Sequence, residues 1–411
     1  MRIGIDGSCW LNRRGYGRFT RELVTALAAR DTGLDCTLLT DFDTSEAPAV
    51  PAGVNIVRIG TKHAAARAAA AGGRRSVGDV WAMSRAIHHQ RFDVMLFPSV
   101  YTYVPVTGSS RVMVGIHDVI AERFPQHVFP DRLSATLWRL KLFAARRQAD
   151  LVFTVSEASK RAIAGHFDIP CERIAVISEA AEQTFRVLPS NDTTRTVLKR
   201  WGLQEQRFVL YVGGISPHKN LAALVDAFSE LRGRAEFSDV RLVLVGDYAG
   251  DVFYSAYEPL RRRVEELGLR ETVCFTGYVA DSDLVHLYNT AACFVLPSLW
   301  EGFGLPVLEA MACGAPVIVS NRGALPEVIA SAGLLFDPDL PGALCAVLRR
   351  LLGSDALQAE LRRLGPSRAA EFSWERAATQ AIDALLGLGG EEWQTANGKF
   401  RMANGKPSSV P

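Results

Sequence analysis

The stretch "SLWEGFGLPVLEAMACGAPVI", Ser298 to Ile318, joins a glycine-rich loop to the start of a helix. A short apolar strand, Phe294–Leu296, precedes it, and Pro306 suits the first turn of the helix that follows. Gly302 and Gly304 leave the backbone N–H groups of the loop open to a ligand. A helix start attracts anions, because its first N–H groups have no partner within the helix. The stretch therefore predicts a strand, an anion-binding loop and a helix in direct succession.

Two glutamates flank this loop: Glu301 is expected on the loop itself and Glu309 about one turn into the helix. A carboxylate only accepts hydrogen bonds, so it can hold two neighbouring hydroxyls at once. Two such groups around an anion-binding helix start suit a ligand with diols at both ends and phosphate in the middle, as in a nucleotide-diphosphate sugar. The alternatives are an acid that compensates the helix dipole for Glu309 and a solvent-facing charge for Glu301. Spacing alone leaves these alternatives open.

Short apolar strands alternate with amphipathic helical patterns on both sides of this stretch. The expected strands are Ile3–Asp6, Cys36–Leu39, Val94–Phe97, Val112–Ile116, Leu151–Val155, Ile174–Ile177, Phe208–Val212, Leu242–Val245, Val273–Thr276, Phe294–Leu296, Val317–Val319 and Leu334–Phe336. The expected helices include Tyr16–Ala29, Val77–Gln90, Leu133–Ala149, Glu157–His166, Leu221–Leu231 and Ser282–Thr290. Such alternation predicts parallel sheets covered on both faces. It runs too long for one sheet, so we predict an α/β fold of two doubly wound, Rossmann-like domains.

The polar stretch Leu188–Trp201 interrupts this alternation and is the best candidate for a linker. It would divide the chain into a first domain, residues 1–190, and a second domain, residues 191–371. The end of the chain, residues 388–411, is rich in Gly, Asn, Ser and Lys and is predicted to be a disordered tail. Open parallel sheets bind ligands beyond the carboxyl ends of their strands, so we expect a ligand in a central cleft between the domains.

The composition of the 411-residue chain fits a soluble globular protein, with 48% apolar and 22% charged residues. The sequence contains no run of 18 apolar residues, so no membrane span is predicted. The net charge is only +2 and ranks no hypothesis about partners by itself. No nucleic-acid partner is expected. The seven cysteines form no CxxC pair and mostly lie in apolar runs, which favours reduced, buried thiols and a cytoplasmic location.

Two further loops follow predicted strands and precede predicted helices. Gly15 and Gly17 bracket a tyrosine after the first strand, where they would let the backbone approach an anion; a simple turn is the alternative. In "YVGGISPHKN", Lys219 stands where a cation could reach a phosphate between the domains, and His218 beside it could donate a hydrogen bond. The alternative is a solvated lysine beside a helix cap at Asn220.

A histidine and an aspartate, His117 and Asp118, follow a strand of the first half. Their position at a strand end would direct them into the proposed cleft. A histidine that is satisfied within the core is an equal alternative.

At these residues the chain resembles glycosyltransferase family 4, the retaining nucleotide-sugar transferases of GT-B fold. The matching pieces are "YGRFTREL", "GIHDVI", "VSEASK", "YVGGISPHKN", "LVLVGDY", "FTGYV", "LPSLWEGFGLPVLEAMACGAPVIVSN", "LPEV", "GLLFDP" and "FSWERAA". They follow the order of the family and span nearly the whole chain before the tail. The Ser298–Asn321 stretch is highly specific, whereas the other pieces are individually weak.

The resemblance implies an acceptor-side first domain, a donor-binding second domain and a last helix, at about 372–387, that packs back on the first domain. It implies that Glu301 contacts sugar hydroxyls with the backbone of the following loop, that Glu309 holds the ribose and that Lys219 binds the donor phosphate. His117 would lie beside the donor sugar and the reacting carbon, and Val279 would meet the base. The catalytic residues expected on this basis are His117, Lys219 and Glu301. The expected donor-binding residues are Gly15, Gly17, Gly214, His218, Lys219, Val279, Glu301, Gly302, Phe303, Gly304, Leu305 and Glu309.

The chain departs from the family pattern at the phosphate site. Gly214 stands where many members carry an arginine, and His218 stands where a subgroup carries another. The second cation is therefore missing or replaced by a titratable group, unless Arg18 or another arginine supplies it. No metal is expected, because a helix start and a lysine can take the place of a cation. The "DSD" stretch, Asp281–Asp283, is interpreted as a helix cap.

The function implied is transfer of a hexose from a nucleotide-diphosphate sugar to a glycan or lipid-linked acceptor in polysaccharide or glycoconjugate biosynthesis. The donor is a substrate, and no separate cofactor is expected. The "SPHKN" loop is similar to that of members using GDP-mannose, which makes GDP-mannose a candidate donor. A catalytically silent module, or a non-transferring enzyme such as a sugar-nucleotide epimerase, is the alternative.

The basic, apolar stretch Arg132–Arg147 is interpreted as a helix that covers the sheet with its long basic side chains extended to water. Contact with the cytoplasmic membrane surface is the second interpretation.

Overall fold

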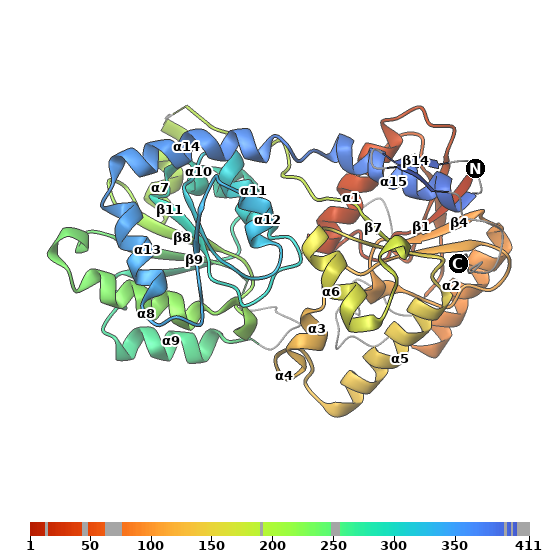
Figure 1. Ribbon diagram of the computed structural model, residues 1–411, viewed down its shortest axis with the longest axis horizontal. Helices are drawn as coiled ribbons and strands as arrows, with labels where there is room; N and C mark the ends of the chain where they lie inside the picture. Colours follow the sequence, from red (N-terminus) through yellow and green to blue (C-terminus); the bar gives the residue numbers. More distant parts are fainter. Residues whose placement is uncertain are drawn as a thin grey trace.

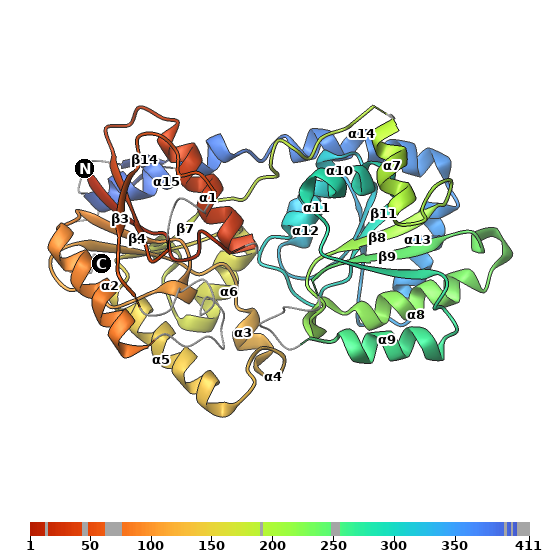
Figure 2. The same cartoon turned by 180° about the vertical axis from the view of Figure 1, so that it is seen from behind.

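Two parallel sheets, each covered by helices, lie side by side along the long axis of the molecule (Figures 1 and 2). The computed structural model describes residues 1–12, 15–42, 48–61, 76–189, 192–247 and 255–389, together with the backbone of 393–395 and 398–400. This arrangement confirms the predicted α/β class with two doubly wound parallel sheets.

The first sheet has seven parallel strands in the order β3-β2-β1-β4-β5-β6-β7. Its strands are β1 (Arg2–Asp6), β2 (Asp35–Thr40), β3 (Asn55–Arg58), β4 (Val94–Phe97), β5 (Arg111–Gly115), β6 (Leu151–Thr154) and β7 (Ile174–Val176). Strands β4 and β6 are buried at every position, because helices cover both faces of the sheet. Strand β3 was not predicted from the sequence: it lies at the sheet edge and is mostly exposed, so it lacks a continuous apolar run.

Helices of the first domain connect these strands. They are α1 (Gly15–Ala28), α2 (Val77–Gln90), α3 (Ile120–Arg123), α4 (Pro125–Val128), α5 (Arg132–Gln148) and α6 (Glu157–Phe167), with short 3-10 turns η3 (Val100–Thr102) and η4 (Cys171–Arg173). Helices α2, α5 and α6 begin at side-chain caps: Ser76, Asp131 and Ser156 each accept a hydrogen bond from the backbone N–H three residues later.

The second sheet has six parallel strands in the order β10-β9-β8-β11-β12-β13. Its strands are β8 (Phe208–Val212), β9 (Arg241–Val245), β10 (Val273–Gly277), β11 (Cys293–Leu296), β12 (Val317–Ser320) and β13 (Leu334–Phe336). Its helices are α7 (Asp192–Arg200), α8 (Leu221–Arg232), α9 (Tyr257–Glu266), α10 (Asp281–Thr290), α11 (Leu305–Ala312), α12 (Leu325–Ile329), α13 (Ala343–Leu352) and α14 (Asp355–Ala369), with 3-10 turns η5 (Pro217–Lys219) and η6 (Ala235–Phe237).

The stretch expected to be a polar linker, 188–201, contains helix α7 instead. Thr194 and Val197 are buried on one face of this helix, and the Thr194 hydroxyl lies 2.9 Å from Nδ1 of His286 on α10. The helix therefore belongs to the second domain. Its few apolar positions gave too weak a periodic signal for prediction.

The last helix, α15 (Trp374–Gly389), returns to the first domain after α14, which lies over the second (Figures 1 and 2). The Trp374 ring packs edge-on against Phe19 of α1, with 5.9 Å between ring centroids. The Gln380 side chain accepts a hydrogen bond of 2.9 Å from the backbone of Ser178, just beyond β7. A chain segment distant in sequence thus completes the first domain.

Residues 388–411 were predicted to be a disordered tail, but two short segments of this stretch form strands. Strands β14 (Trp393–Thr395) and β15 (Gly398–Phe400) pair as an antiparallel hairpin. The neighbouring residues 390–392, 396–397 and 401–411 lie outside the described part of the chain.

All seven cysteines carry free thiols, and five of them are buried, whereas Cys171 is exposed and Cys274 partly exposed. In the described residues, no helix is both long and apolar enough to cross a membrane.

Candidate active site

The glycine-rich loop between β11 and α11 contacts the first domain directly. The carbonyl oxygen of Gly302 accepts hydrogen bonds from the hydroxyls of Ser156, at 2.6 Å, and Ser159, at 3.0 Å, at the start of α6. A Cβ atom at Gly302 would lie only 2.7 Å from the carbonyl oxygen of His117. Glycine at this position therefore allows the two domains to meet backbone to backbone.

Glu301 forms a buried ion pair with Lys219 at this interface. The Lys219 Nζ atom lies 2.7 Å from Glu301 Oε1, and the Ser298 hydroxyl donates to the same oxygen. Burial acts to raise the pKa of Glu301, but Lys219 and these hydrogen bonds hold it below its ordinary value. Glu301 is thus an ionised hydrogen-bond acceptor, and Lys219 is held in front of it.

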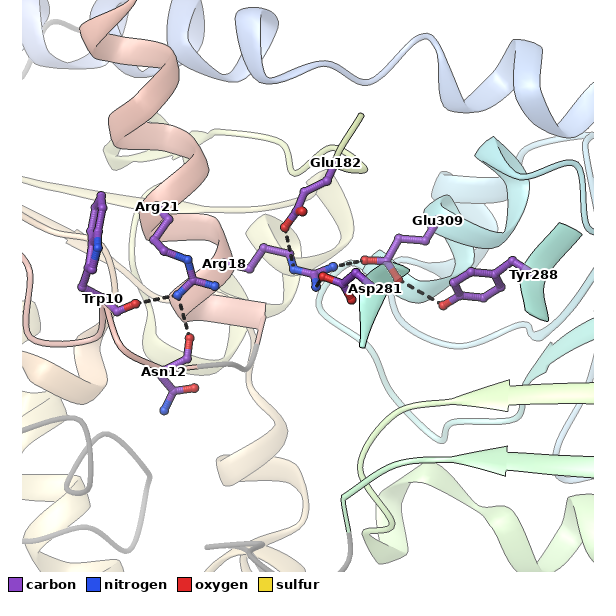
Figure 3. A network of polar contacts seen from close by, with 8 residues as sticks. All are labelled: Trp10, Asn12, Arg18, Arg21, Glu182, Asp281, Tyr288 and Glu309. Carbon is purple, nitrogen blue, oxygen red and sulfur yellow. Dashed lines mark hydrogen bonds and ion pairs between the residues drawn. The ribbon is translucent and has the colours of Figure 1, made fainter. Parts of the chain in front are cut away.

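Glu309 is buried one turn into α11 and is held from two sides (Figure 3). One carboxylate oxygen pairs with Arg18 of α1, and the other accepts a hydrogen bond of 3.1 Å from the Tyr288 hydroxyl on α10. Burial raises the pKa of Glu309 to about 7, although Arg18 opposes the rise. Burial thus shifts the second glutamate of the loop–helix stretch toward its protonated form, and Arg18 favours the ionised form.

Arg18 extends from the first domain into a cluster of three carboxylates, two of them on the second domain (Figure 3). Its guanidinium lies 3.0 Å from Glu182 and 2.6 Å from Asp281, and it also contacts Glu309. Burial acts to lower the pKa of Arg18, but the three carboxylates raise it above its ordinary value. Arg18 is therefore a fixed cation beside the second glutamate.

The interpretation of Asp281–Asp283 as a helix cap is wrong. The cap position of α10 is Ala280, which makes no side-chain capping bond. Asp281 pairs with Arg18, and Asp283 pairs with Arg200 of α7. The sequence pattern of acids in a first helical turn is the same for both roles, so only the folded partner distinguishes them.

His117 lies at the end of β5 with one ring nitrogen bonded to the backbone. Its Nε2 atom is 2.8 Å from the carbonyl oxygen of Pro98. Its Nδ1 atom is 3.9 Å from a carboxylate oxygen of Glu179. Burial lowers the pKa of His117 to about 4, despite the Pro98 contact, so the ring is neutral at neutral pH. The neighbouring Asp118 carboxylate accepts a hydrogen bond of 2.8 Å from the Ile120 backbone.

His218 does not supply the second cation at neutral pH. It is buried next to Lys219, and burial together with that positive charge lowers the pKa of His218 to about 4. Within the described part of the chain its Nδ1 atom has no hydrogen-bond partner. The ring stacks near Phe124, with 6.5 Å between centroids. Gly214 contributes a carbonyl oxygen that accepts a 2.7 Å hydrogen bond from the Tyr211 hydroxyl.

The two glycines of the first loop differ in their surroundings. A Cβ atom at Gly17 would lie 2.1 Å from the carbonyl oxygen of Asn12, whereas nothing lies within 4 Å of a Cβ atom at Gly15. Gly17, in the first turn of α1, is thus required by its close contact with the preceding loop, and Gly15 is exposed at the first position of α1.

The other predicted donor-binding residues are held by packing. The Phe303 ring lies edge-on against Phe372, with 5.6 Å between centroids. Gly304 has a φ of +101°, a conformation that favours glycine, at the residue before α11. The side chains of Leu305 and Val279 are buried.

Sequence reasoning missed Glu179, Glu182 and Tyr288. Glu179 and Glu182 follow strand β7, as His117 follows β5. Ligands bind beyond the carboxyl ends of parallel strands, so this position could have indicated both glutamates as it indicated His117. Tyr288 lies within a helix and carried no comparable signal. Among the described residues no three His, Cys, Asp or Glu side chains cluster as a metal site, and metal independence stays a prediction.

Two family models match the chain in succession. The model described as Glycosyltransferase Family 4 matches residues 13–181, and the model described as Glycosyl transferases group 1 matches residues 195–368.

Similar proteins include two from Escherichia coli and one solved structure from Anabaena. The chain is 34% identical over 278 residues to the O-antigen chain mannosyltransferase B, covering 67% of this chain and 70% of that one. It is 35% identical over 243 residues to the serotype-specific mannosyltransferase WbdA, covering 59% of this chain and 29% of that longer relative. The structure of HepE in complex with UDP and glucose superimposes with a TM-score of 0.71 at 18% identity, covering 94% of this chain and 99% of that one.

Proposed function

Because the chain belongs to the group 1 glycosyltransferases and has their GT-B fold, we propose that it transfers mannose from GDP-mannose to a glycan or lipid-linked acceptor. The activity of a hexosyltransferase in polysaccharide biosynthesis follows from the family and its mannosyltransferase relatives. The proposed choice of donor is supported by those relatives and by the "SPHKN" loop.

One observation carries the proposal: each glutamate of the glycine-rich stretch is already paired with a cation at the domain interface. Lys219 holds Glu301, and Arg18 holds Glu309. A nucleotide-diphosphate sugar would exchange partners with both pairs, because its phosphates attract the two cations and its hydroxyls suit the two carboxylates. Arg18 would then take the place of the phosphate arginine that the family pattern has near Gly214.

The proposed chemistry places the growing charge of the leaving diphosphate near Lys219, Arg18 and the start of α11. Such preorganised electrostatic stabilisation is often the largest catalytic contribution, and loss of one donor group typically costs about 2.7–4 kcal/mol of barrier. We propose retention of anomeric configuration through a front-face reaction in which the leaving phosphate accepts the proton of the acceptor hydroxyl. NMR of the product anomer tests this step, and an inverted product would exclude it.

A thermal-shift screen of UDP-, GDP-, ADP- and dTDP-sugars tests the donor, because a ligand that binds only the folded state raises its melting temperature. GDP-mannose is expected to give the largest shift. Substitution of both glutamates, Glu301→Gln with Glu309→Gln, should lower transfer by about a hundredfold or more. Glu258→Gln, an exposed acid on α9 of the same domain, is the matched control.

Unchanged turnover in the double glutamate variant would overturn the proposed site. Donor binding without transfer to any glycan or lipid extract would favour the silent binding module instead. Conversion of the sugar nucleotide without transfer would favour an epimerase.

We also propose that α5 contacts an anionic membrane surface. One face of this helix, including Trp138 and Leu142, is buried against the first domain. On that face the helix covers the sheet, as the first interpretation of this stretch expects. The opposite face exposes Leu133, Leu137, Leu140 and Phe143, of which Phe143 is 61% accessible. Arginines at 132, 139 and 147 are exposed along the same helix. Apolar side chains flanked by arginines suit the boundary between lipid headgroups and acyl chains.

Flotation with phosphatidylglycerol vesicles tests this surface, with phosphatidylcholine vesicles as the uncharged comparison. The chain is expected to float with the anionic vesicles, and Leu140→Ser with Phe143→Ser should reduce the bound fraction several-fold. Leu340→Ser, an equally exposed leucine of the second domain, is the control. Equal flotation of the α5 variant and the unchanged chain would exclude the proposal.

A further inference from the structure

Glu179 is a buried carboxyl group whose side chain has no hydrogen-bond partner among the described residues. It follows strand β7 and is only 6% accessible to solvent. Its side chain makes no hydrogen bond to the described part of the chain, and one of its carboxylate oxygens lies 3.9 Å from His117 Nδ1. Buried polar groups are normally hydrogen-bonded, so a group left without a partner at a substrate site indicates a place for the substrate.

The hydrogen on His117 can be assigned from its other contact. A carbonyl oxygen only accepts, so the 2.8 Å contact with Pro98 requires a hydrogen on Nε2. The ring is neutral, and its Nδ1 atom is therefore a bare acceptor that faces Glu179. Between these two atoms lies a gap that is too long for a direct hydrogen bond.

We propose that Glu179 positions the transferred hexose by donating a hydrogen bond from its carboxylic acid to one sugar hydroxyl, which in turn donates to His117 Nδ1. A hydroxyl oxygen about 2.8 Å from each atom satisfies the ordinary donor–acceptor distance of both bonds. The inference rests on the proposed function, because the hydroxyl belongs to its sugar donor. Glu179 is a binding and positioning residue, and no covalent step involves it.

The charges around Glu179 favour its protonated form. Burial contributes most, and Glu309, Asp118 and Glu301 add to it, while Arg18 opposes them; together they raise the pKa of Glu179 to about 8. His117, which also faces it, is neutral. At pH 7 the group is therefore a hydrogen-bond donor. It is a poor nucleophile or general base in this form, because both of those roles need the carboxylate.

The pH dependence follows with a definite sign. Below pH 8 the acid keeps its proton and binds the hydroxyl. As the pH rises through about 8 the proton is lost, the donor hydrogen disappears and a further negative charge joins Glu301 and Glu309. We therefore expect kcat/KM for the sugar donor to fall as the pH rises through about 8. This alkaline limb of the pH profile would follow the loss of the Glu179 proton.

Kinetics of Glu179→Ala and Glu179→Gln test the proposal. The alanine variant removes the hydrogen bond and should lower kcat/KM for the donor about tenfold or more at pH 7. The glutamine variant keeps an N–H donor that does not titrate, so it should recover most of that loss and lack the alkaline limb near pH 8. Asp383→Asn, a carboxyl on α15 whose pKa is also raised by burial, is the matched control and should keep the limb.

Three results would overturn the inference. A glutamine variant as inactive as the alanine variant would show that the carboxylate itself is needed. An alanine variant with unchanged donor kinetics, or with a change only in KM for the acceptor, would show that the transferred sugar does not contact Glu179. Should the alanine variant fail to fold, the pH profile of the glutamine variant decides alone.

Failure of this inference is distinguishable from failure of the proposed function. Binding of GDP, followed by thermal shift, reports the nucleotide part of the site and should be equal in all Glu179 variants. If the unchanged chain neither binds nor turns over any nucleotide sugar, the proposed function fails first. If it does both and the Glu179 variants match it, only the role of Glu179 is excluded.

Discussion

At the residue scale, the site consists of buried charges that are each matched to a partner. An isolated buried charge is costly, and a pair is tolerated when the geometry supplies opposite charge and hydrogen bonds. Glu301 meets this requirement through Lys219 and Ser298, and Glu309 meets it through Arg18 and Tyr288. Glu179 has no hydrogen-bond partner among the described residues, and burial favours its neutral, protonated form; we propose a sugar hydroxyl as its partner.

The two glycines in the first turn of α1, Gly15 and Gly17, provide a residue-scale prediction. Gly17→Ala should destabilise the fold by about 1–3 kcal/mol, because its Cβ atom would meet the Asn12 carbonyl oxygen at 2.1 Å. Gly15→Ala should be neutral or stabilising by up to about 1 kcal/mol, because its site is open and alanine favours a helix. Urea unfolding of both variants measures the difference. Equal stability of the two would show that the loop does not pack as described.

At the element scale, part of the site lies on loops that follow strands, as Glu301 does, and part lies on helices, as Arg18 and Glu309 do. The start of α11 combines Gly304, whose φ of +101° suits glycine, with a proline in the first turn. A Cβ atom at Gly304 would also lie 2.7 Å from Leu325 of α12. Both the backbone conformation and the packing therefore require glycine just before the helix, and this local requirement is what made the stretch recognisable in the sequence.

Elements with a strong period were predictable, and those without one were not. Strand β4 and helix α2 have the predicted bounds, Val94–Phe97 and Val77–Gln90. Strand β3 and helix α7 were missed, because one is a mostly exposed edge strand and the other is a short, largely polar helix. Burial on one face creates the periodic pattern, so elements that bury little leave little signal.

At the scale of the whole molecule, the two domains are joined by contacts between residues far apart in the chain. Besides the Arg18 cluster, Glu327 of α12 accepts hydrogen bonds of 3.0 and 2.9 Å from the backbone of Glu157 and Ala158 at the start of α6. A carboxylate at a helix start is stabilised by the helix dipole and by the unpaired N–H groups. These contacts hold the domains together on the side where the donor is proposed to bind.

Loss of these contacts should open the molecule. The double variant Arg18→Ala with Glu327→Ala is expected to have a larger radius of gyration in small-angle X-ray scattering, because interfaces between domains are weak without such pairs. Saturating donor should reduce the difference, since closure around a ligand favours the compact form.

Arg207→Ala is the control for this experiment, because it breaks an exposed ion pair with Asp239 within the second domain. A double variant as compact as the control, with and without donor, would show that these contacts do not hold the domains together.

The sequence by itself determined the α/β class, the two parallel sheets, the family and the glycine-rich stretch at its centre. Each of these depends on patterns that are local in the chain: alternation of strand and helix, and glycines where the backbone must bend or approach another closely. The site residues named from those patterns stay predictions until a donor complex tests them.

The partners of those residues were decided only by the tertiary structure. Arg18 and Glu309 are 291 positions apart, and Lys219 and Glu301 are 82 apart, so no local pattern relates them. The same holds for the burial that keeps His117 and His218 neutral and for the gap between His117 and Glu179. Charge, protonation and hydrogen bonding depend on which groups meet and how much water is excluded, and both are set by tertiary packing within and between the two domains.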